Sequence, residues 1–414
     1  MTRKLCQVST FISSLGIVMA LASRGIFVVG AKRTPFCKYG GSLRELPASY
    51  AYAATAKDAL NSANLDAILI DATIVGNVNF LSQCDGGKTP RYCGLYSGVP
   101  IEKSALGVHK SCGSGLQSVI TGAMEILAGS AKTCLTGGTE AMSSLPFLVR
   151  DVRFGTSLGK PYYLEDHIRK QFPDSYTGLT LQKMAEIIGE RYKINRDMAD
   201  AYAYKSHLKR KAALENKLLK DKLTSLTVTL KKKDVIIEND ELPEVPSIDE
   251  FNSAPLLLSD GKIVTSLNSS VPVDGAAALV LANEGIVKCK NLQPLARVSG
   301  WACVGVDPLD TGLAATPAVM KLLQTVNLNI DDIDIFEINE TFATNALATI
   351  KELKIDENKV NTHGGALALG HPVGATGARM AVHLVHQLNR GVKRAIAASS
   401  CGGGQGIAVL FEAV

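Results

Sequence analysis

The sequence of 414 residues contains no C-x-x-C pair, and its nine cysteines are scattered without paired spacing. This absence argues against a disulfide framework and against a zinc site, and it favours a reducing compartment. Strong charge of one sign is also missing, because the net charge is only +5. The lysines of segment 205–233 are interleaved with Asp and Glu, which is typical of a solvated helical face. No nucleic-acid partner is therefore expected.

Acidic residues are absent before Glu45. Residues 1–24 are basic and contain several Ser and Thr, which predicts a targeting segment for import into an organelle, with the mitochondrion as the favoured destination. Peroxisomal, cytosolic and secretory alternatives stay open, the last because residues 11–22 are mostly apolar and end in Ala-Leu-Ala. This run is too short to span a bilayer as a helix, so no transmembrane segment is expected in the mature protein.

From Gly25 onward, short apolar runs alternate with helical patterns. Residues 26–29 suit a buried strand, residues 50–63 have helical spacing, and residues 68–75 again suit a strand. The apolar positions of 116–127 lie on one face of a helix. Such alternation predicts an α/β fold.

The second half of the chain repeats this order. It predicts a strand near 295–298, a helix over 316–326, a strand over 333–338, a helix with Met380, Leu384 and Leu388, and a strand over 395–398. Two Gly-led apolar segments, 274–281 and 405–411, each suit the last strand of one half. We therefore expect two similar α/β halves, at 25–150 plus 265–288 and at 290–414. Residues 151–264 would be an inserted loop domain, and long insertions commonly cover active sites.

Cys112 lies in the segment His-Lys-Ser-Cys-Gly-Ser-Gly, immediately before an amphipathic helix. Free backbone N–H groups and the positive end of the helix dipole favour a thiolate there, so we expect a lowered pKa and a nucleophile. The alternative, with equal weight on this segment alone, is a small buried cysteine in a tight turn.

His371 lies in a second Gly-rich turn, Gly-His-Pro-Val-Gly-Ala-Thr-Gly, again before a helix. It can act as general base for Cys112. A lone histidine would more often be hydrogen-bonded within its own turn. Because equivalent turns of two similar halves offer a cysteine and a histidine, we expect a site shared between the halves.

Two further segments follow predicted strands. Asn339 comes directly after the strand at 333–338, where its amide can hold a water that donates to an oxyanion, or can cap the next helix. The segment 399–406, Ser-Ser-Cys-Gly-Gly-Gly-Gln-Gly, has glycines that let backbone amides approach a substrate closely.

In this order and spacing, the four segments resemble the thiolase family, specifically the 3-ketoacyl-CoA thiolases. The likeness includes Ala-Lys-Arg-Thr-Pro-Phe at 31–36, Gly-Gly-Thr-Glu-Ala-Met-Ser at 137–143 and Val-Arg-Phe-Gly at 152–155. The resemblance implies a five-layered α-β-α-β-α fold, a loop domain that binds coenzyme A, and a homodimer or homotetramer. It implies no metal and no permanently bound cofactor, with coenzyme A as a co-substrate.

By this resemblance Cys112 attacks the 3-keto carbonyl of an acyl-CoA and His371 takes its proton. Cleavage leaves an acyl thioester on the cysteine, which a second coenzyme A collects. His371 and a water on Asn339 would form one oxyanion hole, and the backbone amides of Cys112 and Gly402 the other. Ser270 matches the family position that meets the pantetheine arm.

The sequence departs from the family at its second catalytic cysteine, the acid/base that is normally spaced as Cys-x-Gly-x-Gly-x-Gly. Without a gap, this pattern puts Ser400 at the cysteine position and Cys401 one residue later, on the opposite face of a strand. We expect Cys401 to reach the site through a locally shortened turn. The alternative is Ser400 in a slow or altered enzyme, because serine is the weaker acid. Thr341 also stands where the family prefers a small apolar residue.

The predicted activity is that of an acetyl-CoA C-acyltransferase of fatty acid β-oxidation. It would cleave 3-ketoacyl-CoA with coenzyme A to acetyl-CoA and a shortened acyl-CoA through a Cys112 thioester. Two alternatives stay open: a condensing enzyme that forms acetoacetyl-CoA, and a catalytically impaired thiolase homologue that binds acyl-CoA.

Overall fold

The computed structural model describes residues 25–414 except 84, 171 and 242–243. The predicted targeting segment 1–24 lies outside the described residues. Within the described part, none of the helices combines the length and the apolar character needed to cross a membrane.

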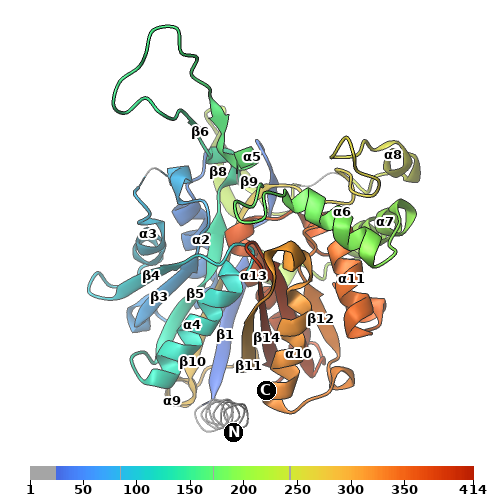
Figure 1. Cartoon of the computed structure of the whole chain (residues 1–414). Helices are drawn as coiled ribbons and strands as arrows, with labels where there is room; N and C mark the ends of the chain where they lie inside the picture. Colours follow the sequence, from blue (N-terminus) through green and yellow to red (C-terminus); the bar gives the residue numbers. More distant parts are fainter. Residues whose placement is uncertain (1–24, 84, 171, 242–243) are drawn as a thin grey trace, which may run out of the picture.

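A ten-stranded sheet runs through the molecule (Figure 1). Its order is β12-β13-β14-β11-β1-β10-β5-β3-β4, and β2 pairs with β10 off this path. The register between β1 and β11 consists of two residue pairs, so the sheet divides there into two halves. The strands are β1 (Ile26–Arg33), β2 (Cys37–Lys38), β3 (Ala72–Gly76), β4 (Ser104–Val108), β5 (Thr133–Glu140), β10 (Val273–Asn283), β11 (Ala296–Gly305), β12 (Ile335–Ile338), β13 (Arg394–Cys401) and β14 (Gln405–Glu412).

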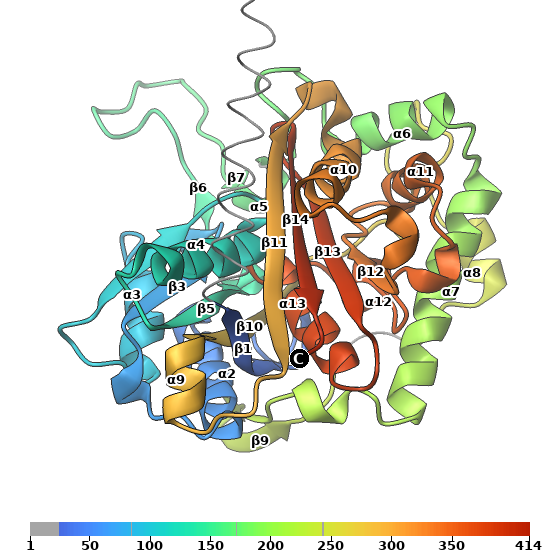
Figure 2. The ribbon, with the colours of Figure 1, turned by 90° about the horizontal axis from the view of Figure 1, so that it is seen from below.

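Two helices, α4 (Ser114–Ala128) and α13 (Val373–Leu388), pack against each other between the halves of the sheet. α13 contacts β1, β5 and β10 on one side and β13 on the other, and most of its residues are buried. Other helices form the two outer layers (Figure 2). They are α2 (Ala48–Ser62) and α3 (Thr89–Tyr96) on the N-terminal half, and α10 (Ala315–Val326) and α11 (Ala343–Leu353) on the C-terminal half. The α/β fold with five layers is thus confirmed.

Most predicted elements lie within a few residues of the observed ones, and two of the differences have a local physical reason. The strand predicted from residue 68 begins at Ala72, because Ala67–Leu69 form a 3-10 turn in which the Asp66 side chain accepts the Ile68 N–H. The edge strand β4 was not predicted, because it is largely exposed and lacks a continuous apolar run.

Among the described residues, segment 151–264 contributes no strand to the large sheet. The chain between β6 (Phe147–Leu148) and β7 (Glu165–Asp166) projects away from the body (Figure 1). The remaining elements of the segment are α5 (His167–Lys170), α6 (Leu181–Arg191), α7 (Arg196–Glu215), α8 (Ile248–Ser253) and the hairpin of β8 (Leu226–Leu230) and β9 (Lys233–Ile237). Its status as a separate loop domain, like the other domain boundaries, stays a prediction.

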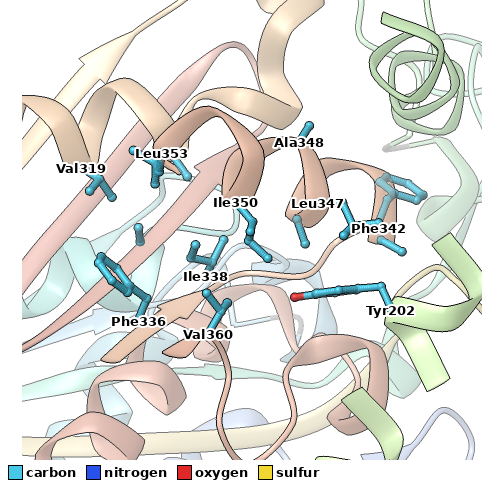
Figure 3. Packing of buried hydrophobic residues seen from close by; sticks show 14 of the residues in the cluster. Tyr202, Val319, Phe336, Ile338, Phe342, Leu347, Ala348, Ile350, Leu353 and Val360 are labelled. Carbon is cyan, nitrogen blue, oxygen red and sulfur yellow. The ribbon is translucent and has the colours of Figure 1, made fainter. Parts of the chain in front are cut away.

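A buried hydrophobic cluster attaches this inserted segment to the C-terminal half. Figure 3 shows Tyr202 of α7 in this cluster with Ile338, Phe342 and Leu347. Helices α6 and α7 both contact α11. The inserted segment therefore packs directly beside residues 339–342, where the sequence predicts part of the site.

Candidate active site

Cys112 lies in the tight connection between β4 and α4, and Gly113 is the N-cap of that helix. The residue before it, Ser111, has a φ of 44°, a left-handed conformation that side chains other than glycine rarely adopt. Such strain is common at functional sites. Cys112 lines a small pocket together with Thr341, Ser400 and Gly402.

His371 reaches the same point from the other half of the sheet. Its Nε2 atom lies 3.1 Å from Sγ of Cys112. Its Nδ1 atom lies 2.6 Å from Oγ1 of Thr376, and that hydroxyl donates its single proton to the Pro372 carbonyl at 3.1 Å. The Thr376 oxygen must therefore accept the proton of Nδ1, which leaves Nε2 unprotonated and able to accept the thiol proton of Cys112.

The resting pair consists of a neutral thiol and a neutral imidazole. Burial, followed by the charge of Arg379, lowers the pKa of His371 to about 4. Burial also raises the pKa of Cys112 to about 11. The predicted lowering of the Cys112 pKa is therefore wrong in its net direction, because desolvation of the thiolate outweighs the hydrogen bonds that the turn supplies.

Three hydrogen-bond donors nevertheless surround the sulfur of Cys112. They are its own backbone N–H, the backbone N–H of Gly402 and the side chain of Thr341, and each favours the thiolate. Two of them are the amides that the sequence predicted for an oxyanion hole. Their use by a substrate stays a prediction.

Asn339 follows β12, and its backbone N–H donates to the Ala398 carbonyl of the neighbouring strand at 3.0 Å. Its side-chain amide donates to Oγ1 of Thr341 at 3.2 Å. The N-cap of the next helix, α11, is Phe342, so Asn339 does not cap it. The side-chain amide therefore faces Thr341, which lines the pocket, and the role of Asn339 in holding a water stays a prediction.

Ser400 and Cys401 occupy opposite faces of β13. The strand is regular to its end, with Ser400 paired to Gly406 and Cys401 to Gln405. Ser400 lines the pocket, whereas Cys401 is fully buried in the core. A Cβ atom on Gly113 would lie 2.5 Å from Sγ of Cys401, so this sulfur packs behind the Cys112 turn. The shortened turn that would bring Cys401 into the pocket does not occur.

The hydrogen bonds of Ser400 further limit what it can do. Its hydroxyl accepts the backbone N–H of Ala315 at 3.0 Å and donates to the Gly312 carbonyl at 3.1 Å. Its only proton is thus directed at the main chain. Burial also raises the pKa of Cys401 far above that of an ordinary thiol. As placed, neither residue is a ready proton donor to a substrate.

Ser270 lies beside the site, where its backbone N–H and its hydroxyl both donate to the Thr341 carbonyl, at 3.0 and 3.1 Å. It is partly buried, and a contact with a pantetheine arm stays a prediction.

Two residues of the site, Thr376 and Glu140, were not predicted to have a role. Glu140, at the end of β5, is buried and accepts the backbone N–H groups of Asn79 at 3.0 Å and Gly374 at 2.8 Å. It thereby joins the N-terminal half to the start of α13, next to His371. Glu140 ends the motif Gly-Gly-Thr-Glu, and Thr376 lies in the motif Gly-Ala-Thr-Gly. In each motif a polar side chain stands among small residues, and this pattern could have indicated a role.

The arrangement combines a nucleophilic thiol, a neutral base within hydrogen-bond distance, and donors aimed at the sulfur. Side chains of α6, Leu181 and Met184, complete an apolar part of the pocket. Such a site is suited to acyl transfer through a thioester, because a thioester stays reactive toward a second thiol. No group of three or more metal-binding side chains occurs among the residues that the structure describes.

Known proteins match the chain over nearly its whole length. The family described as thiolase, N-terminal domain, matches residues 26–285, and thiolase, C-terminal domain, matches residues 292–413. The chain is 39% identical to the mitochondrial 3-ketoacyl-CoA thiolase of Homo sapiens, over 94% of this chain and 98% of that protein. It is 34% identical to an acetyl-CoA acetyltransferase of Syntrophomonas wolfei, over 95% of this chain and 100% of that protein.

Solved structures give the same picture. The crystal structure of human mitochondrial 3-ketoacyl-CoA thiolase is similar with a TM-score of 0.92 and 39% identity, covering 94% of this chain and 99% of that one. The same human protein in complex with CoA is similar with a TM-score of 0.91 and 38% identity, covering 94% of this chain and 98% of that one.

Proposed function

This chain belongs to the thiolase family of acyltransferases, and we propose that it cleaves 3-ketoacyl-CoA with coenzyme A to acetyl-CoA and a shortened acyl-CoA. The observation that carries the proposal is the distance of 3.1 Å between Nε2 of His371 and Sγ of Cys112. A thiol next to an unprotonated imidazole has the partner it needs to become a nucleophile at the moment of attack.

In the first step the thiol proton of Cys112 moves to Nε2 of His371, and the sulfur forms a bond to the 3-keto carbon. The Cα–Cβ bond then breaks, and its electron pair goes to the enolate of acetyl-CoA. The amides of Cys112 and Gly402 are suited to bind a carbonyl oxygen near the sulfur. In the second step, after His371 has given up its proton to the enolate, the thiol of coenzyme A gives its proton to His371 and attacks the acyl thioester; the released Cys112 thiolate takes that proton back.

The enolate needs one proton, and His371 holds the one that it took from Cys112. We propose that His371 returns this proton, because the proton of the Ser400 hydroxyl is directed at the Gly312 carbonyl and Cys401 lies in the core. Every proton of the cleavage step is then accounted for without a second thiol in the pocket. A transfer over a longer path should be slower than one from an adjacent acid, so we expect a modest turnover rate.

The test is an assay of thiolysis with one short and one long 3-ketoacyl-CoA, for wild type, Cys112→Ser and His371→Asn. We expect both variants to lose activity by at least about a thousandfold, since they remove the nucleophile or the base. Incubation of wild type with substrate in the absence of coenzyme A should give an acyl adduct on Cys112 in peptide mass spectrometry. Cys289→Ser, which changes an exposed cysteine, is the matched control. Full thiolysis by Cys112→Ser would rule out the mechanism.

A protein that binds acyl-CoA with little turnover is the second candidate, and Ser400 in the pocket is the observation that favours it. Binding of 3-ketoacyl-CoA in calorimetry without thiolysis would support this candidate, and steady turnover would dispose of it. Net synthesis of acetoacetyl-CoA is less well supported. The relatives named acetyl-CoA acetyltransferase are 33 and 34% identical to the chain, against 37 to 39% for those named 3-ketoacyl-CoA thiolase.

Coenzyme A is proposed as a co-substrate, and no permanently bound cofactor is part of the proposal. Support comes from the human relative that was solved in complex with CoA. We place Ser270 at the pantetheine arm, because it adjoins the pocket through the Thr341 carbonyl. Calorimetry with coenzyme A should show weaker binding by Ser270→Val than by wild type.

A homodimer or homotetramer is proposed as the assembly. The exposed edge strand β4 and the fully exposed Phe154 and Leu158 of the projecting chain support contacts between copies. Light scattering coupled to size exclusion measures the assembly directly, and a monomer at micromolar concentration would contradict the proposal.

A mitochondrial location is proposed from the basic, Ser/Thr-containing segment 1–24 and from the relatives named as mitochondrial. Relatives from Dictyostelium discoideum and from bacteria carry no such word in their names. A fusion of residues 1–24 to a fluorescent protein should colocalise with a mitochondrial marker, and a secreted fusion would favour the secretory alternative.

A further inference from the structure

Thr341 contacts both the amide and the nucleophile of the site. Its hydroxyl accepts a hydrogen bond from Nδ2 of Asn339 at 3.2 Å. Thr341 also lines the same pocket as Cys112, where hydrogen bonding by its side chain lowers the pKa of the thiol. Of Asn339 and Thr341, only Thr341 lines the pocket. The threonine side chain therefore lies between the Asn339 amide and the place where a substrate reacts.

The main chain holds Thr341 firmly. Its carbonyl accepts two hydrogen bonds from Ser270, and the N–H of Ala343, two residues later, donates to the Asn268 carbonyl at 2.9 Å. Phe342 forms a bridge with Ser269. A hydroxyl on such a segment is preorganised, so it loses little entropy when it donates to a charge that develops beside it.

The hydrogen-bond partners of the Thr341 hydroxyl determine where its proton points. A threonine hydroxyl has one proton to donate, and its oxygen accepts from other donors. Because the Thr341 oxygen accepts the Asn339 amide proton, its own proton is free to point at the Cys112 sulfur. The hydroxyl thereby engages one of the two Asn339 amide protons that could hold the water predicted as an oxyanion donor.

We propose that the Thr341 hydroxyl takes the place of that water and is a catalytic residue of this chain. In the free protein it donates to the Cys112 sulfur and favours the thiolate. During the reaction it donates to the oxyanion that forms when the thiolate attacks the substrate carbonyl, while Asn339 polarises it from behind. No bond to Thr341 forms or breaks, and its proton stays on the hydroxyl. The second role rests on the proposed function, and the first does not.

Three substitutions separate a donor from a space-filling side chain. Thr341→Val keeps the shape but removes the donor and leaves no room for water. Thr341→Ser keeps the hydroxyl. Thr341→Ala removes the hydroxyl but opens room in which a water can bind to Asn339. Thr344→Val is the matched control, because it removes a buried threonine hydroxyl nearby that has no contact with Cys112.

The first readout is alkylation of Cys112 by iodoacetamide across a pH series without substrate, followed by peptide mass spectrometry. We expect Thr341→Val to react about tenfold more slowly than wild type at a given pH and to shift its profile to higher pH, because the thiolate loses a donor. Thr341→Ser and Thr344→Val should match wild type, and Thr341→Ala should fall between. An unchanged profile for Thr341→Val would overturn the proposal, as would equal losses for Thr344→Val.

The second readout is thiolysis. Loss of one preorganised oxyanion donor typically lowers kcat by about 10²- to 10³-fold, so Thr341→Val should lose kcat with little change in KM. We expect Thr341→Ala to retain more kcat than Thr341→Val, and the reverse order would overturn the role in catalysis. If wild type itself shows no thiolysis, the proposed function fails, while the alkylation profiles still decide whether Thr341 stabilises the thiolate.

Discussion

Nδ1 of His371 lies 2.6 Å from Oγ1 of Thr376, and the proton of that hydroxyl is engaged by the Pro372 carbonyl. This relationship fixes the tautomer of the imidazole, because the threonine oxygen can then only accept. The first turn of α13 thereby decides which nitrogen faces Cys112. Thr376 touches neither the sulfur nor the pocket, so it is a positioning residue.

Replacement of Thr376 by Val should lower the kcat of thiolysis by about 10- to 100-fold, because the ring loses the partner that sets its tautomer and orientation. KM should stay nearly constant. Thr376→Ser keeps the hydroxyl and should recover most of the rate. Steady-state kinetics of both variants check this, together with circular dichroism to verify folding. Equal activity of Val and Ser variants would show that the hydroxyl does not position the base.

Ser400→Cys should increase the rate of thiolysis by at least about tenfold, because it restores a thiol acid on the pocket face of β13. Cys401→Ala should leave the rate unchanged and lower the free energy of unfolding by about 1 kcal/mol, as a small cavity opens in the core. Thiolysis and denaturant titration on the two variants measure these effects. If Cys401→Ala lost most of its activity at full stability, Cys401 would be the acid after all.

The pH profile of kcat/KM should lack an acid limb near the usual imidazole value. His371 must be neutral to accept the thiol proton, and its lowered pKa of about 4 keeps it neutral as the pH falls. We therefore expect a plateau from about pH 6 to about pH 8, whereas an unperturbed imidazole would lose activity through about pH 6.5. A loss of kcat/KM with a midpoint of about pH 6.5, measured while the enzyme stays folded, would contradict a resting state in which both Cys112 and His371 are neutral.

Lys222, from the inserted segment, is buried with its Nζ atom 2.6 Å from Nδ1 of His383. Burial lowers the pKa of Lys222 to about 7, so the folded state binds fewer protons than the unfolded state between that value and about pH 10. Stability should therefore rise with pH across this window, relative to Lys222→Met, by at most about 1.4 kcal/mol per pH unit.

Denaturant unfolding of wild type and Lys222→Met at several pH values measures this difference, in which the other titrating groups largely cancel. Lys220→Met is the control, because Lys220 is exposed in the same 3-10 turn and should give a flat difference. A difference that falls with pH for Lys222→Met would contradict the depressed pKa.

Much of the fold and the central pair of the site could be predicted, because both depend on local patterns. Apolar periodicity placed helices such as α10 (Ala315–Val326) and strands such as β14 (Gln405–Glu412) within a few residues. Cys112 and His371 stand in Gly-rich turns before helices. Their partnership followed from the duplicated architecture, which brings equivalent turns together.

The remaining features depend on contacts between distant segments. The pKa of Cys112 is set by burial, which no short motif reveals. Thr341 could be recognised as unusual, but its place in one pocket with Cys112 depends on two segments far apart in the sequence coming together. For Cys401, strand alternation predicted the correct face, and the expectation of a shortened turn was wrong because β13 keeps its pairing through its last residue.

Strand β14, formed by the last residues of the chain, lies between β13 and β11 and not at an edge of the sheet. During synthesis the N-terminal half emerges first and can pack. Cys112 then lacks its base, because His371 follows 259 residues later in the chain. The C-terminal half stays an open sheet until its final strand is inserted. Until β14 pairs, β13 and β11 each keep an unpaired edge, so the half of the sheet that carries His371 and Ser400 is completed late in folding.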